Sequence, residues 1–132
     1  MMQYLIDTDI LIYFLKGQKS VTQRFLDARP DSIHTSIVNH AELLYGAYHS
    51  QQKKKNITKI TAFLKTLPVL PFSEAASRYF AELKSKLHTN GNTLADMDLM
   101  IAAICLQNDM VLVTNNTKHF NRVPKLKLDN WR

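Results

Sequence analysis

An apolar segment, residues 99–106, limits the folds open to this chain more than any other stretch. Every residue in it is apolar or small, and Leu, Met and Ala favour helices. A helix that is apolar on all sides must be buried, and this one is too short to span a membrane. Asp96 and Asp98 precede it. One aspartate suffices for a helix start, so two of them beside a buried helix point to a bound cation.

Short apolar runs alternate with helical patterns along the rest of the chain. Strands are predicted at residues 4–6, 32–37, 68–71, 110–113 and 126–128. Helices are predicted at residues 10–15, 20–28, 39–49, 57–67, 73–90 and 96–106. Such alternation favours parallel βαβ units. We therefore expect an α/β fold in which helices flank a central, mainly parallel β-sheet, as a single domain over residues 1–132.

Local residue chemistry sets some of the boundaries between these elements. Ser20 is predicted to cap the second helix and Ser73 the fifth. The polar residues 51–56 are interpreted as an exposed connection between helices, and residues 114–117 as a turn. None of these stretches has the composition of a linker between domains.

Composition indicates the kind of partner and compartment. The chain has 132 residues, is 45% hydrophobic and carries a net charge of +6, which allows a real core and favours an anionic partner, nucleic acid first. The single cysteine, Cys105, excludes a disulfide framework and suits a reducing compartment. The sequence shows no signal peptide and no apolar run of about 18 residues. We expect a cytoplasmic protein without a membrane anchor.

Acidic side chains follow several of the predicted strands. Asp7 ends the first strand, Glu42 lies in the helix after the second, and Asp98 begins the apolar helix that precedes the fourth. The carboxyl ends of parallel strands share one edge of a sheet. Carboxylates gathered there repel by about 4 kcal/mol per pair at an effective dielectric of about 20. Oxygen ligands select a hard ion, Mg²⁺ or Mn²⁺, and paired ions of this kind hydrolyse phosphodiesters.

The segments that carry these acids resemble the PIN-domain ribonucleases, and most closely the VapC toxins of bacterial toxin–antitoxin pairs. The matching stretches are residues 5–12, 42–47, 98–103 and 112–116, followed by His119-Phe120 and Trp131. The resemblance implies a PIN-like three-layer sandwich and an endoribonuclease toxin that depends on Mg²⁺ or Mn²⁺. It also implies a homodimer, a small VapB-type antitoxin that neutralises it, and RNA as substrate, with tRNA cut in the anticodon loop by some members.

Carried over residue by residue, the resemblance assigns the catalytic, metal-binding positions to Asp7, Glu42 and Asp98. The chain departs from the family at two places. Asp9 stands where an asparagine is usual, and Asn116 stands where a fourth acid often follows the last strand. The lost charge at Asn116 predicts weaker binding of a second metal ion. Supporting roles around the site are expected for a further group of residues: Asp9, Asp96, Thr114 and Asn116.

Several of these residues keep a second interpretation. Asp96 is as easily a helix cap as a secondary metal ligand, and Thr114 either holds a carboxylate or water or belongs to turn chemistry. Lys118 and Arg122 follow the acidic edge and are candidate RNA contacts. Lys53 is a candidate too, although a run of lysines is often a solvated helix start.

Partner surfaces are predicted only in outline. We expect the antitoxin to lay a short helix in a groove lined by the aliphatic helices and to insert a basic side chain among the acids. Tyr45 and Tyr48 are assigned to the core or to a dimer surface in preference to a platform for bases.

Two other functions compete with the ribonuclease. The sequence Asp7-Thr8-Asp9 imitates the Asp-x-Asp motif of haloacid dehalogenase-type phosphatases, in which the first aspartate is the nucleophile. A non-catalytic PIN-like module that binds RNA or protein is the other alternative, and Asn116 is the feature that favours it.

Overall fold

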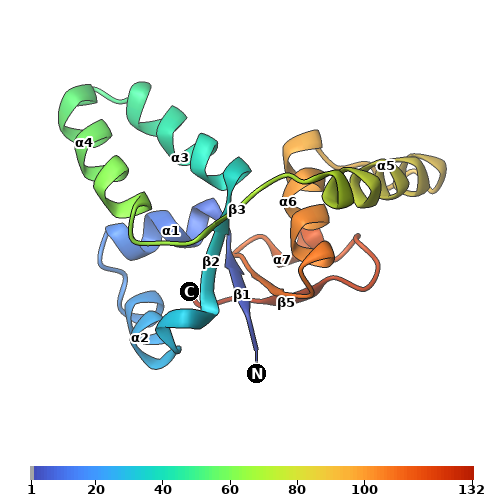
Figure 1. Ribbon diagram of the computed structural model, residues 1–132, viewed down its shortest axis with the longest axis horizontal. Coiled ribbons are helices and arrows are strands. Elements are labelled where there is room, and N and C mark those ends of the chain that lie inside the picture. The colour runs from blue at the N-terminus through green and yellow to red at the C-terminus, as the bar shows by residue number, and fades with distance from the viewer. Residues whose placement is uncertain (1) are drawn as a thin grey trace.

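A computed structural model describes residues 2–132 of the chain, and its centre is a single parallel sheet (Figure 1). The strands are β1 (Tyr4–Ile6), β2 (Ile33–Ser36), β3 (Val69–Leu70), β4 (Val111–Val113) and β5 (Lys127–Asp129). Their order across the sheet is β3-β2-β1-β4-β5, and every neighbouring pair is parallel. The expected α/β fold is confirmed.

Helices connect these strands. They are α1 (Thr8–Leu15), α2 (Lys19–Asp27), α3 (Ile37–Tyr48), α4 (Lys53–Leu64), α5 (Glu74–Thr89), α6 (Asp96–Gln107) and α7 (Thr117–Phe120), with a 3-10 turn, η1, at Pro30–Ser32. The interpretation of residues 53–56 as a connection is wrong, because α4 already begins at Lys53. The predicted turn at residues 114–117 runs into α7, whose four residues are too few to show a helical period.

The predicted cap of the second helix is also wrong. Helix α2 begins at Lys19, so Ser20 already lies inside the first turn. The side chain of Gln18 caps the helix instead, by accepting a hydrogen bond from the backbone N–H of Val21. The Ser20 hydroxyl lies within hydrogen-bond distance of two acceptors, Oε1 of Gln18 (2.8 Å) and the carbonyl of Trp131 (2.9 Å). Ser73 caps α5 as predicted.

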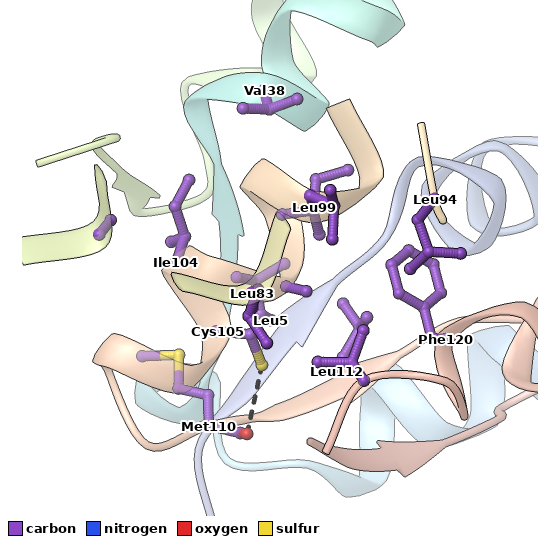
Figure 2. Packing of buried hydrophobic residues seen from close by; sticks show 14 of the residues in the cluster. Leu5, Val38, Leu83, Leu94, Leu99, Ile104, Cys105, Met110, Leu112 and Phe120 are labelled. Carbon is purple, nitrogen blue, oxygen red and sulfur yellow. Dashed lines mark hydrogen bonds between the residues drawn. The ribbon is translucent and has the colours of Figure 1, made fainter. Parts of the chain in front are cut away.

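Both faces of the sheet are covered, which gives three layers. Leu5 and Leu112 pack into a cluster with residues of α5, α6 and α7, and Figure 2 shows part of it. Their chain neighbours Ile6 and Val113 pack on the opposite side, against residues of α1, α2, α3 and α4. Successive strand residues point to opposite faces, so each central strand contributes to both clusters.

Helix α6 is the buried helix that residues 99–106 predict. Leu99 and residues 101–105 are buried. The Sγ of Cys105 donates a hydrogen bond to the carbonyl of Met110, which Figure 2 marks, and burial raises the pKa of this thiol to about 12. No helix within residues 2–132 is long and apolar enough to cross a membrane.

The strand order determines where a site can form. Strand β1 lies between β2 and β4, and the chain leaves the carboxyl ends of these three strands at Asp7, Ser36 and Thr114. In an open parallel sheet, ligands bind at the edge where successive connections turn to opposite sides. Here that place is the carboxyl end of β1 and β4.

Candidate active site

Asp7 lies at the carboxyl end of β1, where the strand ends and α1 begins. It is buried, with 8% exposed. Its carboxylate accepts hydrogen bonds from the backbone N–H of Thr8 (2.9 Å), from Nδ2 of Asn39 (2.9 Å) and from Oγ1 of Thr114 (2.7 Å). Burial raises the pKa of Asp7 above its ordinary value, the hydrogen bonds offset part of that rise, and the charge of Asp98 adds to it.

Glu42 reaches the same place from α3. Its Oε1 accepts a hydrogen bond of 2.7 Å from Oγ1 of Thr8. Burial raises the pKa of Glu42, the Thr8 hydrogen bond lowers it, and the charges of Asp7 and Asp98 raise it. The carboxylates that the sequence assigns to the site therefore repel one another in the folded protein.

A buried amide joins two of these acids, and it was missed by the sequence analysis. Nδ2 of Asn39 donates to Oδ1 of Asp7 and to Oγ1 of Thr8 (3.0 Å), while the Ser36 hydroxyl donates to Asn39 Oδ1 (2.6 Å). Asn39 has no exposed surface. The available signal was a polar residue one helical turn before Glu42.

Asp98 approaches from the first turn of α6. The N-cap of this helix is Ala95, and no side chain caps it, so the two aspartates are not there to cap the helix. Oδ2 of Asp98 lies 2.9 Å from Nε2 of His119, and both side chains are about one quarter exposed. Since the charge of Asp98 shifts the pKa of both Asp7 and Glu42, the three acids belong to one site.

Asp9 and the turn after β4 border the site on one side. Oδ2 of Asp9 accepts a hydrogen bond of 3.1 Å from the backbone N–H of Asn115. Burial, and then the charge of Asp7, raise the pKa of Asp9 to about 6. Thr114 holds the Asp7 carboxylate, and its Oγ1 also accepts from the backbone N–H of Asn116 (3.1 Å).

Other candidate residues lie outside this arrangement. Asp96 forms an ion pair of 2.9 Å with Lys84 at the surface, with 60% of its side chain exposed. The guanidinium of Arg122 donates to the carbonyl of Thr93. All three candidate RNA-binding residues are exposed: Lys53, Lys118 and Arg122.

The acids of the site outnumber the basic side chains beside them: His119 contacts Asp98, and within residues 2–132 Asp7, Asp9 and Glu42 have no ion-pair partner. Within residues 2–132, no lysine or arginine forms an ion pair with Asp7, Asp9, Glu42 or Asp98. The donors are carboxylate oxygens, the ligands that hard divalent ions prefer. In the described part of the chain no three acid, histidine or cysteine side chains are grouped tightly enough to hold a metal. The donor chemistry fits such an ion, and binding requires the carboxylates to draw closer.

An apolar groove leads away from Glu42. Its volume is about 450 Å³, and it lies between α1, α3 and α4. The residues that line it include Ile12, Leu15, Leu43, Ala47 and Ile60. Glu42 stands in this lining, so the groove and the acidic site share a wall.

Comparison with known proteins identifies relatives over the whole chain. The PIN domain model matches residues 4–126. Ribonuclease VapC2 of Rickettsia felis is 35% identical over an alignment of 132 positions that covers 98% of each chain. The tRNA(fMet)-specific endonuclease VapC of Shigella flexneri is 29% identical over 131 residues, 99% of each chain.

Solved structures agree with these relatives in fold. The Rickettsia felis VapBC2 complex bound to a DNA fragment from its promoter contains a chain with a TM-score of 0.90 and 34% identity, covering 99% of this chain and all of that one. The DNA-bound VapBC of Salmonella typhimurium gives a TM-score of 0.92 at 26% identity over the full length of both chains.

Proposed function

This chain belongs to the PIN domain family, and we propose that it is a toxin endoribonuclease that hydrolyses RNA phosphodiester bonds with Mg²⁺ or Mn²⁺ and so inhibits translation. One observation carries the proposal: Asp7, Glu42 and Asp98 lie at the carboxyl edge of the sheet, where the charge of Asp98 raises the pKa of both Asp7 and Glu42. Relatives named as ribonucleases support the reaction class.

The residues of the site have two kinds of role, to hold a metal ion and to orient the acids. Asp7, Glu42 and Asp98 would hold a hard divalent ion, which when bound supplies Lewis-acid stabilisation of the charge that develops on a phosphodiester. Asn39 and Thr114 fix the Asp7 carboxylate by hydrogen bonds. This arrangement keeps the carboxylate oriented, so less reorganisation is needed when the substrate binds.

We propose tRNA as the substrate, with cleavage in the anticodon loop. The support comes from the Shigella flexneri relative, whose name specifies tRNA(fMet). The net charge of +6 suits a polyanion. Lys118 and Arg122 lie on and just after α7, the helix whose His119 contacts Asp98, and so are placed to contact phosphates beside the acids.

The antitoxin partner is proposed from the titles of the VapBC structures. An apolar helix face of a VapB-type antitoxin would fill the groove between α1, α3 and α4. At the wall that the groove shares with the site, a basic side chain of the antitoxin would neutralise Glu42 and block the acids. We also propose that two copies form a homodimer, which light scattering coupled to gel filtration would measure.

The proposed activity is tested by incubating purified, antitoxin-free protein with total small RNA in EDTA, Mg²⁺ or Mn²⁺. Discrete fragments that require the metal, and that disappear with Asp7→Ala and Asp98→Ala, are expected. Asp31→Asn is the matched control, because Asp31 is exposed and pairs with Arg29 away from the site. Absence of cleavage by folded wild type under every metal would exclude the ribonuclease.

The two competing functions have less support. A phosphatase needs Asp7 as a nucleophile, but both of its oxygens accept hydrogen bonds and the side chain is buried. A phosphoenzyme trapped on Asp7 would revive that function. A binding module without catalysis has no need for three acids at one edge of the sheet, one of which, Asp7, is buried without a lysine or arginine partner. RNA binding without cleavage would support it.

A further inference from the structure

Helices α3 and α4 form a hairpin whose charge differs from that of the rest of the chain. Figure 1 shows the two helices side by side, on the opposite flank of the molecule from α5 and α6. From residue 43 to residue 73 the sequence contains no aspartate or glutamate. The same stretch carries lysines at positions 53, 54, 55, 59 and 65. The hairpin beyond Glu42 is therefore a positively charged surface.

This surface also carries exposed aromatic side chains. Tyr45 is 68% exposed and Tyr48 is 56% exposed, so of the two places predicted for them, the core or a dimer surface, the core is wrong. The ring of Tyr45 stacks on that of His49, with centroids 5.6 Å apart and planes 9° from parallel. Nζ of Lys53 lies 5.5 Å from the ring centroid of Tyr48. Exposed aromatic rings beside lysines are the chemistry that binds unpaired bases and their phosphates.

The surface continues from the acidic site. Tyr45 and His49 follow Glu42 by three and seven residues, and such spacings share one side of a helix. The groove uses a neighbouring side of α3, where Gly46 and Ala47 line it. Tyr45 therefore lies on the same side of α3 as Glu42, beside the groove.

We propose that the surface formed by Tyr45, Tyr48, His49 and Lys53–Lys55 binds single-stranded RNA next to the cleaved bond. The inference rests on the proposed ribonuclease function and adds the conformation of the substrate. Bases stack on the tyrosines while the lysines neutralise phosphates. In double-stranded RNA the bases are already stacked inside the helix, so they cannot use this platform.

A second copy of the chain fits this surface less well than RNA does. An isologous interface brings the same patch of two subunits together. Here that pairing would place lysines against lysines with no acid beyond Glu42 in either hairpin, and like charges disfavour it. The phosphates of RNA neutralise the lysines of this surface, whereas a second copy of the same surface does not.

The test measures binding without cleavage, in an Asp98→Asn background. The probe is a fluorescein-labelled single-stranded RNA of mixed sequence, compared with a duplex of the same length, and anisotropy is read at several salt concentrations. Tyr45→Ala should weaken single-strand binding about tenfold, and Tyr45→Phe should retain it. Tyr79→Ala is the matched control, because Tyr79 is an exposed tyrosine of α5.

The lysines are tested by the salt dependence of the same binding. Replacing Lys53, Lys54 and Lys55 together with alanine should reduce the slope of log K against log salt by about 2, since single strands lose about 0.7 per phosphate contact. Lys86→Ala on α5 is the control. Circular dichroism and thermal melting establish that each variant is folded.

Three results would overturn the inference. The first is an unchanged affinity for single-stranded RNA in both the Tyr45 and the lysine variants. The second is an equal loss of affinity for the single strand and for the duplex in these variants. The third is a loss of the dimer while the affinity for RNA is kept, which would make the hairpin a dimer surface. Failure of the parent function is distinguishable, because a protein that cleaves no RNA with any metal can still bind single strands through Tyr45. Conversely, wild-type cleavage with unaffected hairpin variants would refute only this inference.

Discussion

Asn39 donates a hydrogen bond to the buried carboxylate of Asp7, with 2.9 Å between Nδ2 and Oδ1, although the residues are 32 positions apart in the chain. The same nitrogen donates to Thr8, whose hydroxyl donates to Glu42. One side chain thus orients two carboxylates that enter the site from different elements. The Ser36 hydroxyl fixes which way the amide points.

Replacing Asn39 with alanine should reduce cleavage at least tenfold and destabilise the fold by about 1–3 kcal/mol, because Asp7 and Thr8 lose a buried donor. Urea denaturation measures the second effect and kcat the first. Thr58→Ala serves as control, since its hydroxyl bonds only to its own helix at the surface. Full activity in a folded Asn39→Ala protein would refute the orienting role.

Asp9 should make stability depend on pH. Its pKa is raised from 3.8 to about 6, mainly by burial and then by the charge of Asp7. Between these values the folded protein holds a proton that the unfolded chain has released, so stability rises as pH falls through this window. Above pH 6 the carboxylate of Asp9 is ionised in the folded protein, and its burial lowers the free energy of unfolding.

Asp9→Asn removes that cost and should stabilise the protein at pH 7 by about 1 kcal/mol, after allowance for partial solvation. Melting curves from pH 4 to pH 8 would show a flatter profile for the variant than for wild type. Identical profiles would mean that the Asp9 carboxylate is well solvated. Asp31→Asn, an exposed change, should leave the profile unaltered.

Asn116 bears on the number of metal ions. Asn116→Asp adds a negative charge beside Thr114, to which its backbone is already hydrogen bonded, so binding of a second Mn²⁺ should become tighter. Titration calorimetry with Mn²⁺ gives stoichiometry and affinity for both proteins. Unchanged values would count against a weakened second metal position in the wild type.

Gly46 tests the groove at a position that carries no acid, one helical turn after Glu42. A Cβ added there meets no atom within 4 Å, and the residue lines the groove. Gly46→Phe should weaken neutralisation by the antitoxin more than tenfold while RNA cleavage persists, because the ring occupies the space of the docked helix. Gly46→Ala is the matched control and should stabilise α3 by about 0.5–1 kcal/mol. Equal neutralisation of both variants would place the antitoxin elsewhere.

The sequence predicted what depends on neighbouring residues and missed what depends on contacts across the chain. Asp7 was placed correctly at the end of β1 because an apolar run stops there, and the buried α6 follows from its uninterrupted apolar residues. The role of Asn39 depends on the pairing of β1 with β2, which no local pattern encodes. The sequence did not predict Gln18 as the cap of α2, because the nearby Ser20 has the commoner capping side chain.

Exposure was the least predictable property of α3. Tyr45 and Tyr48 have the apolar character of core residues, but the groove-facing side of the helix is occupied by Leu43 and Ala47. Which side of an amphipathic helix faces inward depends on the neighbours it meets, and for α3 these include the helices α1, α4 and α6. Tyrosine occurs in both environments, because its ring is apolar and its hydroxyl is polar.

The single thiol of the chain offers a practical opportunity. Cys105 is fully enclosed in α6, with a pKa of about 12, so alkylating reagents should not reach it in the native state. A cysteine introduced at the surface can therefore carry a spectroscopic label in the otherwise wild-type background. The rate at which Cys105 itself is slowly modified would report how often the core around α6 opens. This rate can be measured whether or not the protein is catalytically active.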